Sequence, residues 1–194
     1  MPLPGEASQN KMIPVTRSPL NIDITFQSSS VLILLYPYNN EMNVILMKRT
    51  LDDTPHSGQI SFPGGRFEPG DNSLQETALR EAEEELGISA SGIEILGHLT
   101  PLQIQVSNME VKPFVGVLYK KPLFRPNPGE VDYLIEVKVK DLLDPGIIEK
   151  KVEYIRGNRI EMPYYNIRNN HIWGATAMIL SEFLDILRNI GIWE

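Results

Sequence analysis

The stretch "GGRFEPGDNSLQETALREAEEELGI", from Gly64 to Ile88, carries the strongest pattern in the chain. A glycine pair opens it, an acidic loop follows, and four glutamates fall within the six residues 80–85. Like charges three or four residues apart destabilise a helix by roughly 0.2–0.5 kcal/mol per pair. A helix that keeps these carboxylates together therefore needs something that offsets their repulsion.

The boundaries of this helix can be predicted from its capping residues. Ser73 and Glu76 have the S-x-x-E spacing of a capping box, so the helix should begin near Ser73. Gly87 is well suited to end it, because glycine readily adopts the left-handed conformation found after helices. Apolar residues recur every four positions and predict a stripe that faces the core, made of Leu74, Ala78, Ala82 and Leu86.

Three of the glutamates share one face of the predicted helix. Glu81, Glu84 and Glu85 stand at positions i, i+3 and i+4, beside the apolar stripe, whereas Glu83 turns away into solvent. Carboxylates converging within one turn suit Mg²⁺ or Mn²⁺, which prefer hard oxygen ligands and often bridge to substrate phosphates. From the carboxylates alone, a solvated surface helix is the more usual interpretation.

Apolar and alternating runs on both sides of this stretch predict a set of strands. They cover residues 30–37, 42–49, 59–65, 93–102, 111–119 and 131–139. Asn39 and Asn40 form a turn signal between the first two strands, and a second hairpin is predicted around residues 156–159. A C-terminal helix is predicted from Gly174 to Gly191, and the first 20 residues look extended. The pattern favours an α/β (α+β) fold in one domain, residues 1–194, with two helices.

The composition narrows the class of protein. The chain has 194 residues, is 42% hydrophobic, and carries a formal net charge of -7, which argues against binding to nucleic acid or to an anionic membrane. It has no cysteine, so disulfides, thiolate zinc sites and cysteine nucleophiles are excluded. Neither a secretion signal nor a membrane-length apolar stretch is recognisable, and a cytoplasmic location is the default expectation.

The glycine pair, the acidic loop and the helix together resemble the Nudix box, the signature of Nudix hydrolases. That signature reads glycine, five residues, glutamate, seven residues, then R-E-apolar-x-E-E-x-G-apolar. Gly65 begins it here, and residues 80–88 match its end in full. The chain departs from it in two ways: the middle acid is Asp71, and eight residues rather than seven separate it from Arg80.

These departures resemble the coenzyme A pyrophosphatase-like Nudix proteins, which also share a "GQIxFPGG" lead-in, present here at residues 58–65. Other similar stretches are residues 4–17, 99–102, 111–118, 129–131 and 172–180. One mismatch concerns the substrate: Thr54 stands where that subfamily usually has an arginine.

The resemblance implies an α/β/α sandwich with a mixed β-sheet, the box helix and a C-terminal helix. It also implies metal-dependent hydrolysis of a phosphoanhydride in a nucleoside diphosphate linked to another group. Coenzyme A or acyl-CoA, cleaved to 3′,5′-ADP and (acyl-)4′-phosphopantetheine, is the substrate it favours. Another substrate, such as ADP-ribose, NADH or a nucleotide sugar, and a catalytically silent binding module are the alternatives.

The resemblance finally gives roles to residues. Mg²⁺ or Mn²⁺ would be held by Glu81, Glu84 and Glu85, Arg80 would orient these acids, and Glu130 would be a further ligand or the general base. The candidates for substrate binding are Gly64, Gly65, Arg49, Lys48 and Lys112. Surface roles stay open for Glu130, Lys48 and Arg49, hydrogen bonding is expected of His56 and His98, and Trp173 is expected in the core. The expected partner is a small nucleoside-diphosphate molecule, and a homodimer is among the oligomeric states left open.

Overall fold

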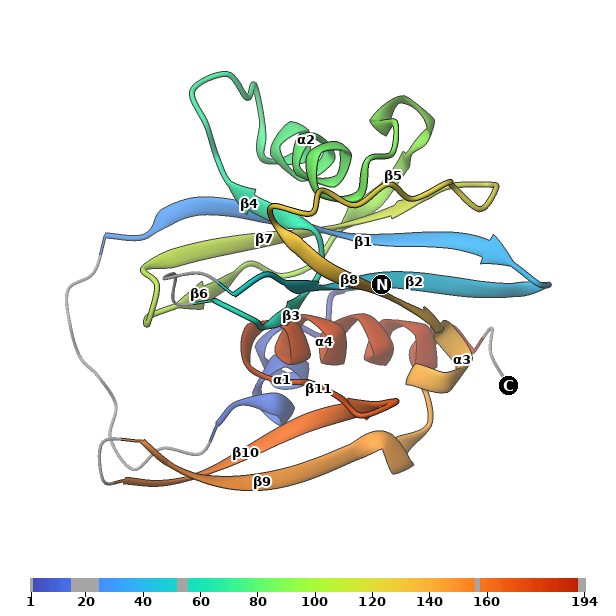
Figure 1. Cartoon of the computed structure of the whole chain (residues 1–194). Coiled ribbons are helices and arrows are strands. Elements are labelled where there is room, and N and C mark those ends of the chain that lie inside the picture. Colours follow the sequence, from blue (N-terminus) through green and yellow to red (C-terminus); the bar gives the residue numbers. More distant parts are fainter. Residues whose placement is uncertain (1, 15–24, 52–55, 156–157, 192–194) are drawn as a thin grey trace.

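The computed structural model of the chain describes residues 2–14, 25–51, 56–155 and 158–191. A mixed β-sheet forms its middle layer, with one long helix on each face and a small second sheet beyond one of these helices (Figure 1). Within the described ranges, no helix has the length and apolar character needed to cross a membrane.

The predicted N-terminal hairpin is confirmed by strands β1 (Gln27–Tyr38) and β2 (Glu41–Arg49). The turn residues Asn39 and Asn40 have φ values of 51° and 59°, a conformation that asparagine tolerates better than most residues. The turn signal in the sequence therefore corresponds to a tight two-residue connection.

The main sheet has eight strands built around β1. The remaining six are β3 (Ile60–Ser61), β4 (Gly64–Arg66), β5 (Glu94–His98), β6 (Leu102–Ile104), β7 (Met109–Val117) and β8 (Val131–Lys138). β1 pairs in parallel with β7 and antiparallel with β2 and β4, so the sheet is mixed, as predicted.

Two long helices cover the two faces of this sheet (Figure 1). They are α2 (Leu74–Leu86) and α4 (Gly174–Ile190). Alternate residues of β1 enter different clusters: Leu32 packs in the cluster that contains Ala78 of α2, and Ile33 in the one that contains Leu180 of α4. Burial on both faces explains why β1 reads as an unbroken apolar run rather than an alternating one.

A second sheet of three strands was only partly predicted. It contains β9 (Ile148–Ile155), β10 (Asn158–Ile167) and β11 (Asn170–Ile172). The predicted hairpin joins β9 to β10, and residues 156–157 of its turn lie outside the described residues. β11, only three residues long, was not predicted, nor was the short helix α3 (Val139–Leu142), followed by a 3-10 turn at Pro145–Ile147.

The prediction of an extended N-terminal segment is wrong for residues 6–12. They form helix α1 (Glu6–Gln9) and a 3-10 turn, Asn10–Met12. The buried Glu182 of α4 accepts hydrogen bonds from Gln9 Nε2 at 2.9 Å and from Gly5 N at 3.2 Å, and Met12 enters the core. Tertiary contacts of this kind override a polar composition that has little helical tendency of its own.

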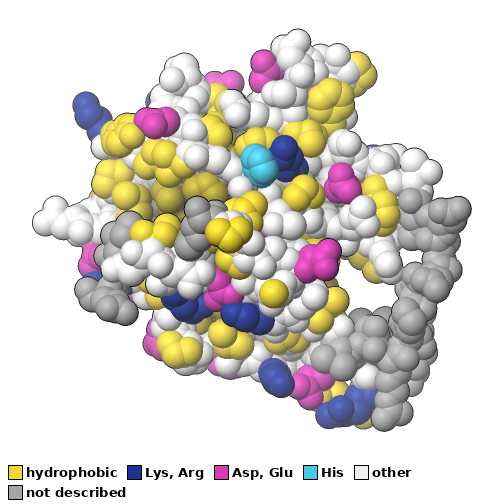
Figure 2. Space-filling model, turned by 180° about the vertical axis from the view of Figure 1, so that it is seen from behind, with side chains coloured by type: hydrophobic (Ala, Val, Ile, Leu, Met, Phe, Trp, Pro, Cys, Tyr) yellow, Lys and Arg dark blue, Asp and Glu magenta, His cyan; other side chains and the backbone are white. Residues whose placement is uncertain are grey.

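The back of the molecule mixes charges of both signs (Figure 2). Among the described side chains on that face, Lys and Arg lie interspersed with Asp and Glu, and apolar side chains gather towards one side. The described side chains of this face therefore form no broad basic area of the kind that attracts nucleic acid.

Candidate active site

Helix α2 has the predicted register, and its N-terminal cap differs in one detail. Ser73 Oγ accepts a hydrogen bond from Glu76 N at 3.2 Å. The return bond of the box runs from Asn72 N to Glu76 Oε2 at 2.7 Å, one residue before the position expected from the capping box. Gly87 ends the helix with a φ of 63°.

Glu85 joins α2 to the sheet from a buried position. Its carboxylate accepts hydrogen bonds from Gly64 N of β4 at 2.8 Å and from Arg49 Nη1 of β2 at 3.0 Å. Burial raises the pKa of Glu85 to about 8. The Gly64 N–H and Arg49 lower this pKa, whereas the carboxylates of Glu81 and Glu130 raise it further. The carboxylates of Glu81 and Glu85 on α2 and of Glu130 before β8 therefore repel one another here.

Glu81 lies one turn earlier on α2 and packs against Gly65. A Cβ atom added to Gly65 would stand only 2.3 Å from Glu81 Oε1, so glycine leaves the space that this carboxylate fills. Burial raises the pKa of Glu81. Arg80 lowers this pKa, whereas the carboxylates of Glu84 and Glu130 raise it further.

Glu130 comes to this cluster from the start of β8. Its carbonyl accepts a hydrogen bond from Thr50 N at 3.0 Å, and its carboxylate accepts one from Asn127 Nδ2 at 3.3 Å. Asn127 N in turn donates to the carbonyl of Glu85 at 3.0 Å, which ties this loop to the end of α2. The structure thus brings together Glu130 and the box glutamates.

Arg80 pairs with acids on both sides of it. Its Nε and Nη2 atoms donate to the two oxygens of Asp71 at 2.9 and 3.1 Å. Its Nη1 atom donates to Glu81 at 2.9 Å and to the half-exposed Glu84 at 3.0 Å. The guanidinium therefore holds Glu81 and Glu84 and is itself held by Asp71.

The donor set of this cluster fits a divalent cation. Buried carboxylates whose pKa is raised by burial and by one another gain from a neighbouring positive charge. Carboxylate oxygens are also the ligands that Mg²⁺ and Mn²⁺ prefer. Within the described residues, no three acidic or histidine side chains already surround a common point, and Arg80 donates hydrogen bonds to oxygens of Glu81 and Glu84.

Glu83 faces away from the cluster, as predicted. Its side chain is not merely solvated, because Glu83 Oε1 accepts a hydrogen bond from Ala90 N at 2.9 Å, just beyond the helix.

The Asp71–Arg80 pair yields a prediction for stability. Asp71→Asn removes the charge from a two-bond pair and should lower the free energy of unfolding by roughly 1.5–3 kcal/mol, the range for hydrogen bonds to charged groups. The Arg80 guanidinium holds the pKa of Asp71 well below its ordinary value of 3.8. The pair therefore stabilises the fold above that pH, and its contribution is lost as the pH falls below it.

Denaturant unfolding of Asp71→Asn and the unmodified chain at several pH values checks this prediction. The difference between them should be full at pH 7 and should shrink in strong acid. A difference that is constant across this range would contradict the assignment.

The two lysines predicted to bind substrate, Lys48 and Lys112, do not lie among the box glutamates. β2 turns alternate side chains to opposite faces, so Lys48 lies on the face away from α2, while Arg49 reaches Glu85. Lys112 Nζ lies 5.6 Å from the ring centre of Phe114.

The two histidines form hydrogen bonds, as expected. His56 bonds with the side chain of Gln59, and His98 bonds with a backbone carbonyl. Thr54 lies outside the described residues.

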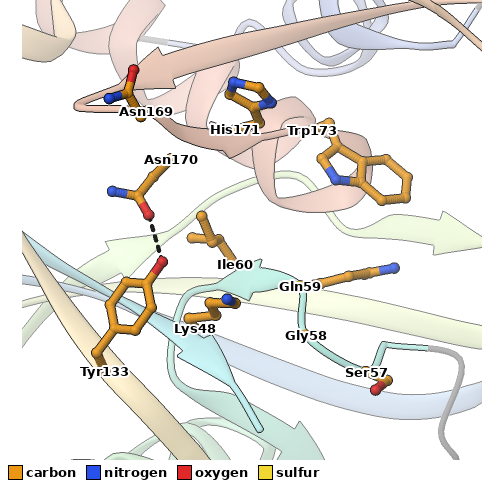
Figure 3. A pocket seen from close by; sticks show the side chains of 10 residues that line it. All are labelled: Lys48, Ser57, Gly58, Gln59, Ile60, Tyr133, Asn169, Asn170, His171 and Trp173. Carbon is orange, nitrogen blue, oxygen red and sulfur yellow. Dashed lines mark hydrogen bonds between the residues drawn. The ribbon is translucent and has the colours of Figure 1, made fainter. Parts of the chain in front are cut away.

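Lys48 instead lines a pocket of about 340 Å³ between the main sheet and β11 (Figure 3). The ten lining residues are Lys48, Ser57, Gly58, Gln59, Ile60, Tyr133, Asn169, Asn170, His171 and Trp173. The prediction that Trp173 lies in the core is wrong, because β11 and the start of α4 place it at the pocket wall. Tyr133, Asn170 and His171 were missed, since only the fold brings these separate stretches together.

The fold and this cluster define a class of protein. The NUDIX domain family matches residues 27–156 of the chain, which therefore belongs to the Nudix hydrolase family. Hydrolases of this family generally need divalent metal ions such as Mg²⁺ or Mn²⁺.

Among individual proteins, the chain is 38% identical over 143 residues to the uncharacterized Nudix hydrolase NudL of Yersinia enterocolitica, covering 72% of this chain and 71% of that one. It is 35% identical over 144 residues to NudL of Pectobacterium atrosepticum, covering 72% of each. A solved MutT protein from Methanosarcina mazei matches with a TM-score of 0.56 at 16% identity, covering 87% of this chain and 99% of that one. This likeness confirms the predicted sandwich fold.

Proposed function

We propose that this Nudix hydrolase cleaves the diphosphate of coenzyme A or acyl-CoA, releasing 3′,5′-ADP and (acyl-)4′-phosphopantetheine. The observation that carries the proposal is the position of residues 58–65, the coenzyme A-type lead-in. Its first residues line the pocket, and its glycine pair contacts Glu85 and Glu81. One short segment thus adjoins both the carboxylate cluster and a site large enough for part of a substrate.

The reaction requires water to attack one phosphorus while the P–O bond of the anhydride breaks, giving two phosphate monoesters. A bound Mg²⁺ or Mn²⁺ ion, held by Glu81, Glu84 and Glu85, would neutralise the diphosphate and lower the pKa of a water. Glu130, whose carboxylate faces these glutamates, is our candidate to accept the proton of the attacking water.

The surrounding residues hold this arrangement in place. Arg80 fixes the carboxylates of Glu81 and Glu84, and Arg49 sets a positive charge against Glu85. Gly64 lets β4 lie close to the backbone of β1, and Gly65 leaves room for the carboxylate of Glu81 on α2.

A substrate panel under one metal condition tests the proposal. We expect coenzyme A to have a higher kcat/KM than dephospho-coenzyme A, ADP-ribose and NADH, and no substrate to turn over in excess chelator. A tenfold preference corresponds to about 1.4 kcal/mol of transition-state discrimination. Tenfold preference for ADP-ribose or NADH would overturn the coenzyme A assignment, and turnover in excess chelator would overturn the role of the metal.

A further inference from the structure

The pocket and the carboxylate cluster lie at the same end of β2, on opposite faces of the sheet. Lys48 lines the pocket, and the next residue, Arg49, contacts Glu85 on the other face. Arg49 N also donates to the carbonyl of Gln59, another pocket residue, at 3.0 Å. A substrate whose diphosphate lies at the carboxylates would have to pass around this end of the strand to enter the pocket.

The charge of the pocket wall differs in sign from that of the chain as a whole. On a protein with a net charge of -7, the ten described lining residues include one lysine and one histidine and no acid. Lys48 Nζ lies 3.5 Å from Asp132, which does not line the pocket, and 5.2 Å from the ring centre of Tyr133. A second ammonium group, that of Lys151, lies 5.3 Å from the ring centre of Trp173. The wall therefore favours an anionic ligand.

The shape and the other groups of the wall favour a ligand with a flat ring. Tyr133 and Lys48 rise from the sheet, and His171 and Trp173 face them from β11 and the start of α4 (Figure 3). The Tyr133 hydroxyl donates to Asn170 Oδ1 at 2.8 Å, which fixes one amide at the rim. The volume of about 340 Å³ lies near the lower end of the range of about 300–1,000 Å³ for small-molecule sites.

We propose that this pocket binds the phosphorylated adenosine end of the substrate, with Lys48 contacting the 3′-phosphate and the aromatic wall contacting the base. The inference rests on the proposed function, because coenzyme A carries a negatively charged 3′-phosphate that a cation of the protein would have to bind. All three cations suggested by the sequence already have a carboxylate or an aromatic ring beside them, so their position relative to the pocket decides between them. Lys48 alone of these three lines the pocket.

Binding of two nucleotides without turnover tests the inference. Adenosine 3′,5′-bisphosphate and AMP, which lacks the 3′-phosphate, are titrated by calorimetry into the full chain in excess chelator. We expect the bisphosphate to bind roughly tenfold more tightly than AMP, because a charge-assisted contact is lost with AMP. Lys48→Met should abolish this difference while leaving AMP affinity within about twofold.

Lys121→Met is the matched control. Lys121 has a similar exposure, 30% against 32% for Lys48, and likewise lies beside a carboxylate, that of Glu136, and over a tyrosine ring, that of Tyr38. It is absent from the pocket wall, so this variant should keep the bisphosphate preference. Loss of the preference in both variants would point to net charge alone and would overturn the inference.

The remaining outcomes are also decisive. The inference fails if the unmodified chain shows no preference for the bisphosphate, or if Lys48→Met keeps it. Because no hydrolysis is measured, a chain that prefers ADP-ribose or NADH in the substrate panel would refute the proposed function, while this titration would still decide the pocket.

Discussion

Glu85→Gln is expected to reduce kcat by at least about a hundredfold while the protein stays folded. Removing one carboxylate weakens the hold on a metal ion that contributes several kcal/mol to transition-state stabilisation, and each 1.36 kcal/mol is about a factor of ten in rate. Glutamine keeps the shape of the side chain and an oxygen that can accept from Gly64 N. Steady-state kinetics with saturating Mg²⁺ and a thermal melt together measure both effects.

Glu83→Gln is the control for this variant. It makes the same chemical change two residues away, on the side of α2 where Glu83 contacts Ala90 N. Its kcat should stay within about threefold of that of the unmodified chain, or about 0.7 kcal/mol in activation free energy, because Glu83 faces away from the cluster. Equal damage from both variants would mean that α2 presents a different face to the substrate.

Gly65→Ala is expected to lower kcat by about tenfold or more with only a small change in melting temperature. The new Cβ would lie 2.3 Å from Oε1 and 2.7 Å from Oε2 of Glu81, so that carboxylate must move. It sits at the flexible end of a side chain, and its movement costs the fold little. The misplacement should lower turnover, because a shift of about 1 Å in a catalytic group can cost about a hundredfold.

Gly64→Ala should behave in the opposite way. Its Cβ would stand 2.3 Å from the carbonyl oxygen of Ser30 and 2.6 Å from Cα of Val31, both of them backbone atoms of β1. The pairing of β4 with β1 would have to open, so a large loss of stability is expected. If Gly65→Ala instead unfolds the protein and Gly64→Ala does not, the assignment of the two glycines is wrong.

Local signals in the sequence predicted the parts of the structure that depend on nearby residues. Ser73 and Gly87 located the ends of α2, and Asn39 and Asn40 located the turn of the first hairpin. Each of these residues acts on backbone groups within a few positions of itself, so its effect is visible in the sequence alone.

Features that depend on distant contacts were missed or misplaced. α1 is held by Glu182 of α4, and its own polar sequence contains little that favours a helix. Trp173 was expected in the core, yet the short strand β11 places it at the pocket wall. The different faces of Lys48 and Arg49 follow only once the sheet and its two covering helices are known.

The bonds between α1 and α4 also bear on the order of folding. Gln9 and Glu182 are 173 residues apart in sequence, and Gly5 and Glu182 are 177 apart. Contacts of such separation carry a large loop-closure entropy, so they form late unless much of the chain is already in place. We therefore expect α1 to dock onto an assembled sheet and to be the first element to detach, with faster amide hydrogen exchange than that of β1.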